Sequence, residues 1–144
     1  MPAPKGNEYW KLADWGNPKK YQPQGLWESS CDYFKWALEN PWHKNEAIKG
    51  GDAAGTIVSI PIPRPFTLHG LCIYLGIVTE TFRDYEKQEA FSSVCKRIRE
   101  IIYNNKFEGA AVGTYNHAII ARDLGLADKK DIDLSAKVDF RDAE

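Results

Sequence analysis

The chain has 144 residues, of which 43% are hydrophobic and 27% are charged, and this balance is typical of one folded domain. Its net charge of −1 excludes a strongly basic protein, so a nucleic-acid partner has to meet a local basic patch or many copies of one. No apolar run approaches membrane-spanning length, and the three cysteines contain no C-x-x-C pair. We expect a soluble intracellular protein with no membrane partner, buried reduced thiols, and neither zinc nor disulfides.

The first third of the chain is unusually rich in large rings. All five tryptophans lie between residues 10 and 42, which is more ring surface than one small core requires. Large rings are rarely left in solvent, so the N-terminal arm, residues 1–24, is expected to lie against its own subunit or a neighbour. We interpret the surplus as a subunit interface, with dense packing inside one chain as the alternative. The candidate interface residues are Trp10, Trp15, Trp27, Trp36 and Trp42.

A first helix is predicted over residues 25–40, because apolar residues recur there at spacings of three and four and Pro41 follows. The apolar stripe that we expect this helix to bury consists of Trp27, Cys31, Phe34 and Leu38.

A β-hairpin is predicted at about residues 45–63. Residues 56–62 alternate between apolar and other side chains, a glycine-rich turn precedes them, and residues 45–49 form the first arm. Three prolines at alternate positions remove N–H donors along one edge, which blunts that edge against a further strand. These prolines are Pro61, Pro63 and Pro65.

Residues 67–87 have the pattern of two short helices folded about a glycine, which is typical of a helix-turn-helix corner. Gly76 supplies the turn, Thr79 is the predicted cap of the second helix, and that helix is expected to bury Phe82 and Tyr85. Its three acids and two bases sum to −1, which repels a phosphate backbone. The corner is therefore either a DNA-reading unit or a plain structural corner.

A long core helix is predicted over residues 88–107, where six apolar residues share one stripe. A small, glycine-rich segment, residues 108–113, then suits a close helix crossing. Asn116 is the predicted cap of a last helix, and Gly125 is its predicted stop. The charged side of the long helix is either a phosphate-binding group or a solvated face, and it carries Lys96, Arg97 and Arg99.

No catalytic constellation is visible in the sequence. His43, His69 and His117 lack the spacing of a zinc helix, and the glycine clusters lack the Gly-Lys-Ser/Thr of a nucleotide-binding loop. We therefore expect a protein that is not an enzyme and that needs no cofactor.

Several short stretches, taken in order, carry a family resemblance: Ala3-Pro4-Lys5-Gly6-Asn7; Leu26-Trp27-Glu28 with Cys31, Tyr33-Phe34 and Glu39-Asn40-Pro41; Thr67 with Gly70-Leu71; Thr79-Glu80-Thr81; Ile102-Tyr103; Lys106-Phe107 with Gly109-Ala110-Ala111; and Asn116 with residues 119–126. They resemble the small terminase subunit, the DNA-packaging protein of tailed bacteriophages, in the short-tailed, headful-packaging branch. The match covers nearly everything up to residue 126. No single stretch is diagnostic, but their order and spacing together are fairly specific.

The resemblance implies a mainly α protomer, with a helix-turn-helix-like corner and an inserted β-hairpin, that assembles into a closed homo-oligomeric ring, commonly of nine subunits. Such a ring recognises the packaging site on double-stranded viral DNA in the host cytoplasm. It also regulates the ATPase and nuclease of the large terminase subunit without being a catalyst itself. Residues 1–126 would form the oligomerisation and DNA-packaging domain, with the hairpin crowning the ring, and residues 127–144 a mobile acidic tail.

The surface that contacts DNA is the point at which this chain departs from the family. In the similar branch, DNA contact is associated with a basic C-terminal extension, whereas residues 127–144 carry six acids and four bases. The tail is instead a candidate contact to the large subunit. The remaining candidates for DNA binding are Lys5, Lys11, Lys19, Lys20, Arg83, Lys87, Lys96, Arg97 and Arg99.

Two other functions stay open beside this one. A helix-turn-helix transcriptional regulator would be a two-fold dimer on paired half-sites, with a recognition helix of favourable charge. A structural ring protein would assemble in the same way without touching nucleic acid.

Overall fold

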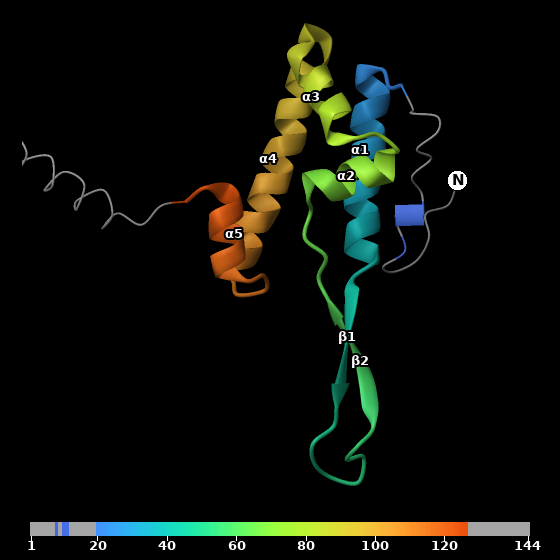
Figure 1. Cartoon of the computed structure of the whole chain (residues 1–144), viewed down its shortest axis with the longest axis vertical. Coiled ribbons are helices and arrows are strands. Elements are labelled where there is room, and N and C mark those ends of the chain that lie inside the picture. Colours follow the sequence, from blue (N-terminus) through green and yellow to red (C-terminus); the bar gives the residue numbers. More distant parts are fainter. Residues whose placement is uncertain (1–7, 9, 12–19, 127–144) are drawn as a thin grey trace, which may run out of the picture. The chain divides into compact units, whose positions relative to one another are not determined.

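The computed structural model describes residue 8, residues 10–11 and residues 20–126. Their elements run in the order α1 (Pro23–Glu39), β1 (Trp42–Ala47), β2 (Ile57–Ile62), α2 (Leu68–Leu75), α3 (Thr79–Lys87), α4 (Glu89–Ala111) and α5 (His117–Leu124), as Figure 1 shows. The chain forms two compact units, residues 1–106 and residues 107–144. The predicted class, mainly α with a helix-turn-helix-like corner and an inserted hairpin, is confirmed.

Helix α1 forms where it was predicted, but of the predicted stripe only Phe34 is buried, and the buried face is shifted to one side of that stripe. Its buried residues include Leu26, Ser30, Tyr33 and Ala37, at spacings of four, three and four. In the predicted stripe, Leu38 is 71% exposed, and Trp27 and Cys31 are only half-buried. The prediction was rotated by one residue because it counted apolar side chains only. A small serine, Ser30, lies at the centre of the true face and is fully buried.

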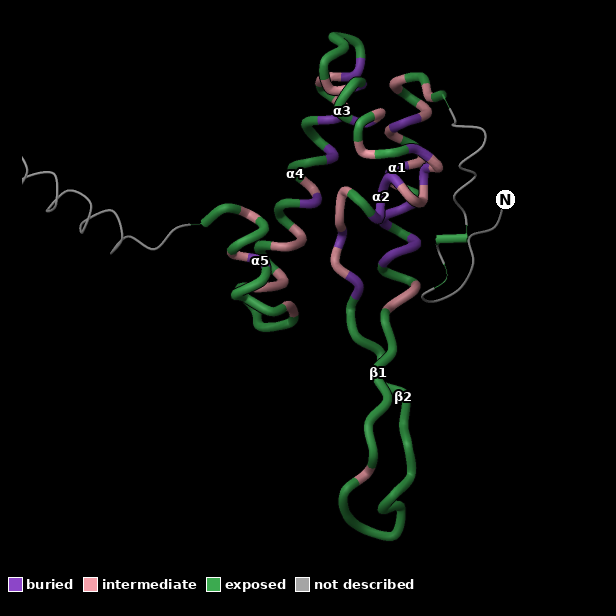
Figure 2. The backbone as a smooth tube through the Cα atoms, in the orientation of Figure 1, coloured by how far each residue is buried: buried purple, intermediate pink, exposed green. Residues whose placement is uncertain are grey.

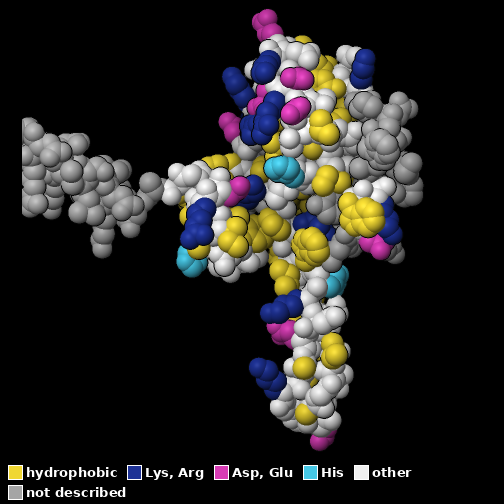
Figure 3. All heavy atoms as spheres, viewed as in Figure 1, with side chains coloured by type: hydrophobic (Ala, Val, Ile, Leu, Met, Phe, Trp, Pro, Cys, Tyr) yellow, Lys and Arg dark blue, Asp and Glu magenta, His cyan; other side chains and the backbone are white. Residues whose placement is uncertain are grey.

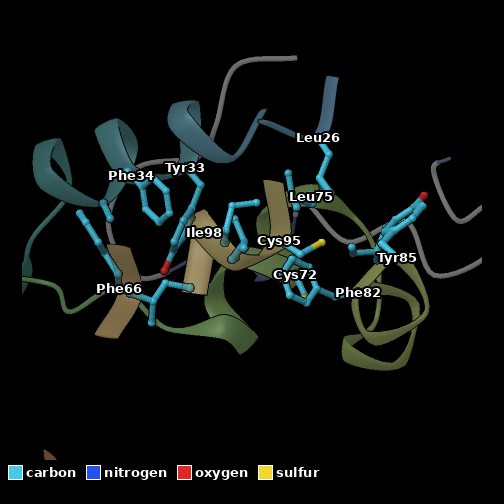
Figure 4. Packing of buried hydrophobic residues seen from close by; sticks show 14 of the residues in the cluster. Leu26, Tyr33, Phe34, Phe66, Cys72, Leu75, Phe82, Tyr85, Cys95 and Ile98 are labelled. Carbon is cyan, nitrogen blue, oxygen red and sulfur yellow. The ribbon is translucent and has the colours of Figure 1, made fainter. Parts of the chain in front are cut away.

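The core of the first unit brings α1, α2, α3 and α4 together. Figure 4 shows large side chains from all four helices pointing into one cluster. Phe66, from the loop between β2 and α2, lies beside Phe34. Tyr33 lies among these rings and is 1% exposed. Its ring is within 7 Å of several others, whose centroids lie at the distances expected of tilted and stacked aromatic pairs: Phe34, Trp36, Phe66 and Tyr74.

The two helices of the corner fold about a glycine, as predicted. Gly76 has a φ of 73° at the end of α2, in the left-handed region that suits glycine. Phe82 and Tyr85 of α3 are buried. The predicted Thr79 cap was wrong, because Val78 holds the cap position with no side-chain hydrogen bond and Thr79 is already the first helical residue. The side-chain cap belongs to α2 instead, where Thr67 Oγ1 accepts a hydrogen bond from Gly70 N at 2.9 Å.

Strands β1 and β2 pair antiparallel as the predicted hairpin, from Trp42 opposite Ile62 to Ala47 opposite Ile57. Figure 1 shows the hairpin extending away from the helices of its unit, and Figure 2 shows it exposed along both strands. Ile48 N donates to Thr56 O at 2.9 Å, so the alternation of the ladder gives Pro61 a non-hydrogen-bonded position opposite His43. Its missing donor therefore lies on the outer edge of β2. Pro63 and Pro65 lie beyond the strand.

The loop from β2 to α2 is anchored to α1 through Arg64, which is only 5% exposed. Arg64 Nε donates to the backbone oxygen of Asn40 at 2.8 Å. Its guanidinium lies 5.0 Å from the centre of the Trp36 ring and 4.6 Å from that of Trp42, so it lies against both rings in cation–π contact. Because Trp42 begins β1, this contact also holds the base of the hairpin.

Two further hydrogen bonds hold the same loop. Phe66 N donates to Asn105 Oδ1 of α4 at 2.9 Å, and Thr67 N donates to the Tyr33 hydroxyl of α1 at 3.2 Å. The backbone that joins the hairpin to the corner is therefore held by side chains from two helices.

Helix α4 buries the predicted stripe, with Phe91, Cys95, Ile98 and Ile102 as its buried members. It runs to Ala111, so the predicted break near residue 107 does not occur. No helix in the described part of the chain is both long and apolar enough to cross a membrane.

In the second unit, α5 has the predicted ends. Asn116 Oδ1 accepts from Ile119 N at 3.0 Å, and Gly125 adopts a φ of 72° while Leu126 N donates to Ala121 O at 2.9 Å. The predicted close approach in residues 108–113 is made by a side chain rather than by a crossing helix. A Cβ on Gly109 would collide with the Tyr115 ring.

The three thiols differ in environment. Cys72 and Cys95 are buried, and burial raises the pKa of Cys72 to about 12 and that of Cys95 to about 11. Cys31 is half-buried; its partial burial and the acids Asp32 and Glu28 raise its pKa as well. All three thiols are therefore protonated near neutral pH.

Gly70 tests the packing of α2 on α1. A Cβ at Gly70 would lie 2.6 Å from the Tyr33 hydroxyl and 2.7 Å from Thr67 Oγ1. Gly70→Ala should therefore lower the free energy of unfolding by roughly 1–3 kcal/mol in urea titrations, although alanine normally favours a helix. The matched control is Gly50→Ala in the hairpin turn, where a Cβ meets nothing within 4 Å. Equal stability of the two variants would contradict the close approach.

The thiols give a second test of the core. In the folded protein at pH 8, a chromogenic disulfide reagent should react slowly with one thiol, Cys31, because Cys72 and Cys95 are shielded. All three should react at once in denaturant. Rapid reaction of two or more thiols in the native protein would refute this assignment.

The raised pKa values of the buried thiols also predict that the free energy of unfolding falls as the pH rises above about 9, where the thiols of the unfolded chain ionise first.

Candidate functional site

The residues singled out in the sequence occupy several separate parts of the described structure. His43, His69 and His117 lie on three different elements, β1, α2 and α5. Among the described residues, no three histidine, cysteine, aspartate or glutamate side chains gather where they could hold a metal ion. The described residues also present three other features: the bases, the tryptophan rings and a groove.

The charge of α3 is altered by a residue from another helix. Arg99 of α4 forms a bidentate ion pair with Glu86. Its Nε donates to Oε2 and its Nη2 donates to Oε1, both at 2.6 Å. This hydrogen bonding to Glu86 raises the pKa of Arg99. Counting Arg99, the corner's sum of −1 becomes −3 + 3 = 0. The repulsion of phosphate expected from the sequence is therefore weaker than the helix alone suggests.

The predicted phosphate-binding group on α4 is not uniform. Arg99 is turned toward Glu86, and its guanidinium also lies 5.5 Å from the centre of the Phe82 ring. Arg97 pairs with Glu100 at 3.4 Å. Lys96 is exposed and forms no ion pair with any described residue, so it is the member of the group best placed to meet a phosphate.

The other predicted bases lie on α3 and on the segments before α1. Arg83 and Lys87 are exposed on α3 without an ion pair to a described residue, and Lys20 is exposed just before α1. Lys11 pairs with Glu8 at 3.1 Å. Figure 3 shows basic and acidic side chains interleaved over α3 and the start of α4, so one copy presents no continuous basic face in this view. Lys5 and Lys19 lie outside the described residues.

The predicted interface tryptophans fall into distinct environments. Trp36 is 6% exposed and stacks on Tyr33 in the core of its own chain, so it has almost no surface left for a neighbour. Trp27 is half-buried against the same core. Trp42, 42% exposed, and Trp10, 59% exposed, present large areas to solvent. Trp15 lies outside the described residues.

A groove of about 550 Å³ lies where the segment just before α1 (residues 20–22), α3 and the start of α4 meet. Its apolar part is formed by the rings of Tyr85 and Phe91, which stack with their centroids 4.4 Å apart. Lys20 and Asp84 contribute opposite charges to its lining. Sequence reasoning missed this groove, because its residues are apart in the chain and follow no motif.

The groove has a fixed wall. Tyr21 N donates to the Tyr85 hydroxyl at 3.0 Å, and the Tyr21 hydroxyl donates to Leu75 O at 2.6 Å. Partial burial is the main reason that the pKa of Tyr21 is raised, so this hydroxyl keeps its proton. The segment that precedes α1 is thereby tied to both helices of the corner.

Comparison with known proteins gives two findings. A family model described as DNA-packaging protein gp3 matches residues 16–132 of this chain. The chain is also 38% identical over 138 residues to the protein named "Terminase, small subunit" of Salmonella phage P22, across 92% of this chain and 83% of that protein.

Proposed function

The chain belongs to the small terminase subunit family of DNA-packaging proteins, and from this membership we propose that it forms the ring that selects viral DNA for packaging. The ring contains about nine copies, acts in the host cytoplasm, and regulates the ATPase and nuclease of the large terminase subunit. The subunit itself is not a catalyst. The observation that carries the proposal is the match of residues 16–132 to the packaging family.

Assembly into a ring supplies the positive charge that a single copy lacks for binding DNA. Among the predicted bases of α3 and α4, three form no ion pair with a described residue: Arg83, Lys87 and Lys96. So few uncompensated charges attract DNA weakly. Repeating them around a rotation axis builds a field that a single copy does not have.

Exposed apolar side chains support contact between copies. The hairpin carries Val58, Ile60 and Ile62 on one face, each more than a third exposed, with Trp42 at its base. An isolated two-stranded hairpin is marginally stable in water, so a neighbouring surface would stabilise it. Exposed apolar residues that lie together are typical of association sites.

A dimeric transcriptional regulator is the second candidate, and the confirmed two-helix corner about Gly76 favours it. Two-fold assembly with paired half-sites is its requirement. A structural ring that never touches DNA is the third candidate. The mass of the assembly and the salt dependence of DNA binding separate the three.

The first test is the mass of the purified protein by native mass spectrometry and light scattering. We expect one dominant species at about nine times the chain mass of 16.4 kDa. A dimer would favour the regulator, and a monomer at every concentration would remove the ring. Trp36→Ala is not a suitable interface probe, because it opens a cavity in the core, and Trp42 holds the base of the hairpin through Arg64. Ile60→Ser, at an exposed side chain of the hairpin, is the better variant.

The second test is the salt dependence of binding to double-stranded DNA. Arg83→Gln, Lys87→Gln and Lys96→Gln together should make the negative slope of log K against log salt less steep. The expected change is about 0.9 for each phosphate that is no longer neutralised, because fewer counterions are released. Lys35→Gln, which removes one exposed charge from α1, is the control and should leave the slope unchanged. If only Lys35→Gln changes the slope, the DNA binds a face of the subunit other than the one that carries Arg83, Lys87 and Lys96. No binding at any salt concentration would favour the structural ring.

A further inference from the structure

The groove between the segment that precedes α1, helix α3 and the start of α4 has aromatic side chains in its lining. Its lining includes the stacked rings of Tyr85 and Phe91, and its volume of about 550 Å³ is in the range of ligand-binding clefts. The hydrogen bonds of Tyr21 to Tyr85 and to Leu75 hold one wall in place, so the cost of ordering the site is already met in the free chain.

The lining of the groove also specifies charge. Lys20 and Asp84 are both exposed, so each can meet an opposite charge on an incoming segment. A well-matched occupant therefore has an aromatic ring with one acid and one base beside it.

The segment from Glu8 to Lys11 has these features. Trp10 is 59% exposed, Lys11 lies 5.5 Å from the centre of the Trp10 ring, and Lys11 pairs with Glu8. An acid and a base therefore lie beside one large exposed ring. Trp10 is not among the residues that line the groove of its own chain.

We propose that Trp10 of one copy inserts into the groove of the next copy, with Lys11 facing Asp84 and Glu8 facing Lys20. The proposal rests on the proposed ring and identifies one of its contacts. Trp10 and the groove are different surfaces of the same chain. A contact between different surfaces is heterologous, which is the kind that continues around a ring, whereas a two-fold dimer pairs one surface with itself.

The direct test is a disulfide between copies. Lys11→Cys and Asp84→Cys are combined, so that the Trp10 ring is kept, with Cys31→Ser to remove the half-buried native thiol. Mild oxidation should give a ladder of covalent multimers on a non-reducing gel, and each single-cysteine variant should give at most a dimer. A fast-migrating monomer would mean that the arm folds onto its own groove, which overturns the proposal. An assembly of unchanged mass without cross-links would also overturn it.

Substitutions give a second, independent measurement. Trp10→Ala should weaken association by at least about thirty-fold per contact, as expected of a tryptophan at the centre of an interface, while Trp10→Phe should retain most of it. Asp84→Lys should weaken assembly, and adding Lys11→Asp should restore it. If Trp10→Ala leaves the assembly intact, the proposed Trp10 contact is refuted, whereas the proposed ring is not. If the unaltered chain is a monomer at every concentration, both proposals fail.

Discussion

The interaction on which the first unit depends most is the anchoring of the loop from Pro63 to Thr67. Two of its residues are prolines without N–H donors, so its position rests on three others: Arg64 against two tryptophan rings, Phe66 on Asn105, and Thr67 on Tyr33. These contacts use α1 and α4 at once. The direction of the hairpin and the start of the two-helix corner are therefore set by the same few side chains, and a change at Arg64 would reach both.

Much of the local structure could be predicted from the sequence, because its causes lie within a few residues of one another. The turn at Gly76 and the ends of α5 at Asn116 and Gly125 each depend on one backbone angle or one short hydrogen bond. The hairpin follows from alternation and proline placement in the same way. The family resemblance is confirmed by the match over residues 16–132.

Features that depend on distant residues could not be predicted. The Glu86–Arg99 pair joins residues thirteen apart, and only folding shows that it cancels the acidity of α3. The burial of Trp36 depends on Tyr74 and Arg64, which lie far along the chain. Composition treated all five tryptophans alike, whereas the environments of the four described ones range from core to solvent. The groove could not be predicted either, because residues from three separate segments of the chain form it. The predicted DNA-binding and interface residues therefore stay predictions that depend on assembly.

The position of Pro61 has a consequence for solubility. An exposed ribbon rich in isoleucine is a template on which unpaired strands stack into fibrils. At Pro61 the outer edge of β2 lacks a donor, so a chain that added there would lose a hydrogen bond where growth has to continue. Pairing of a further strand along this edge of β2 is thus disfavoured in every copy, even though the hairpin is apolar and exposed.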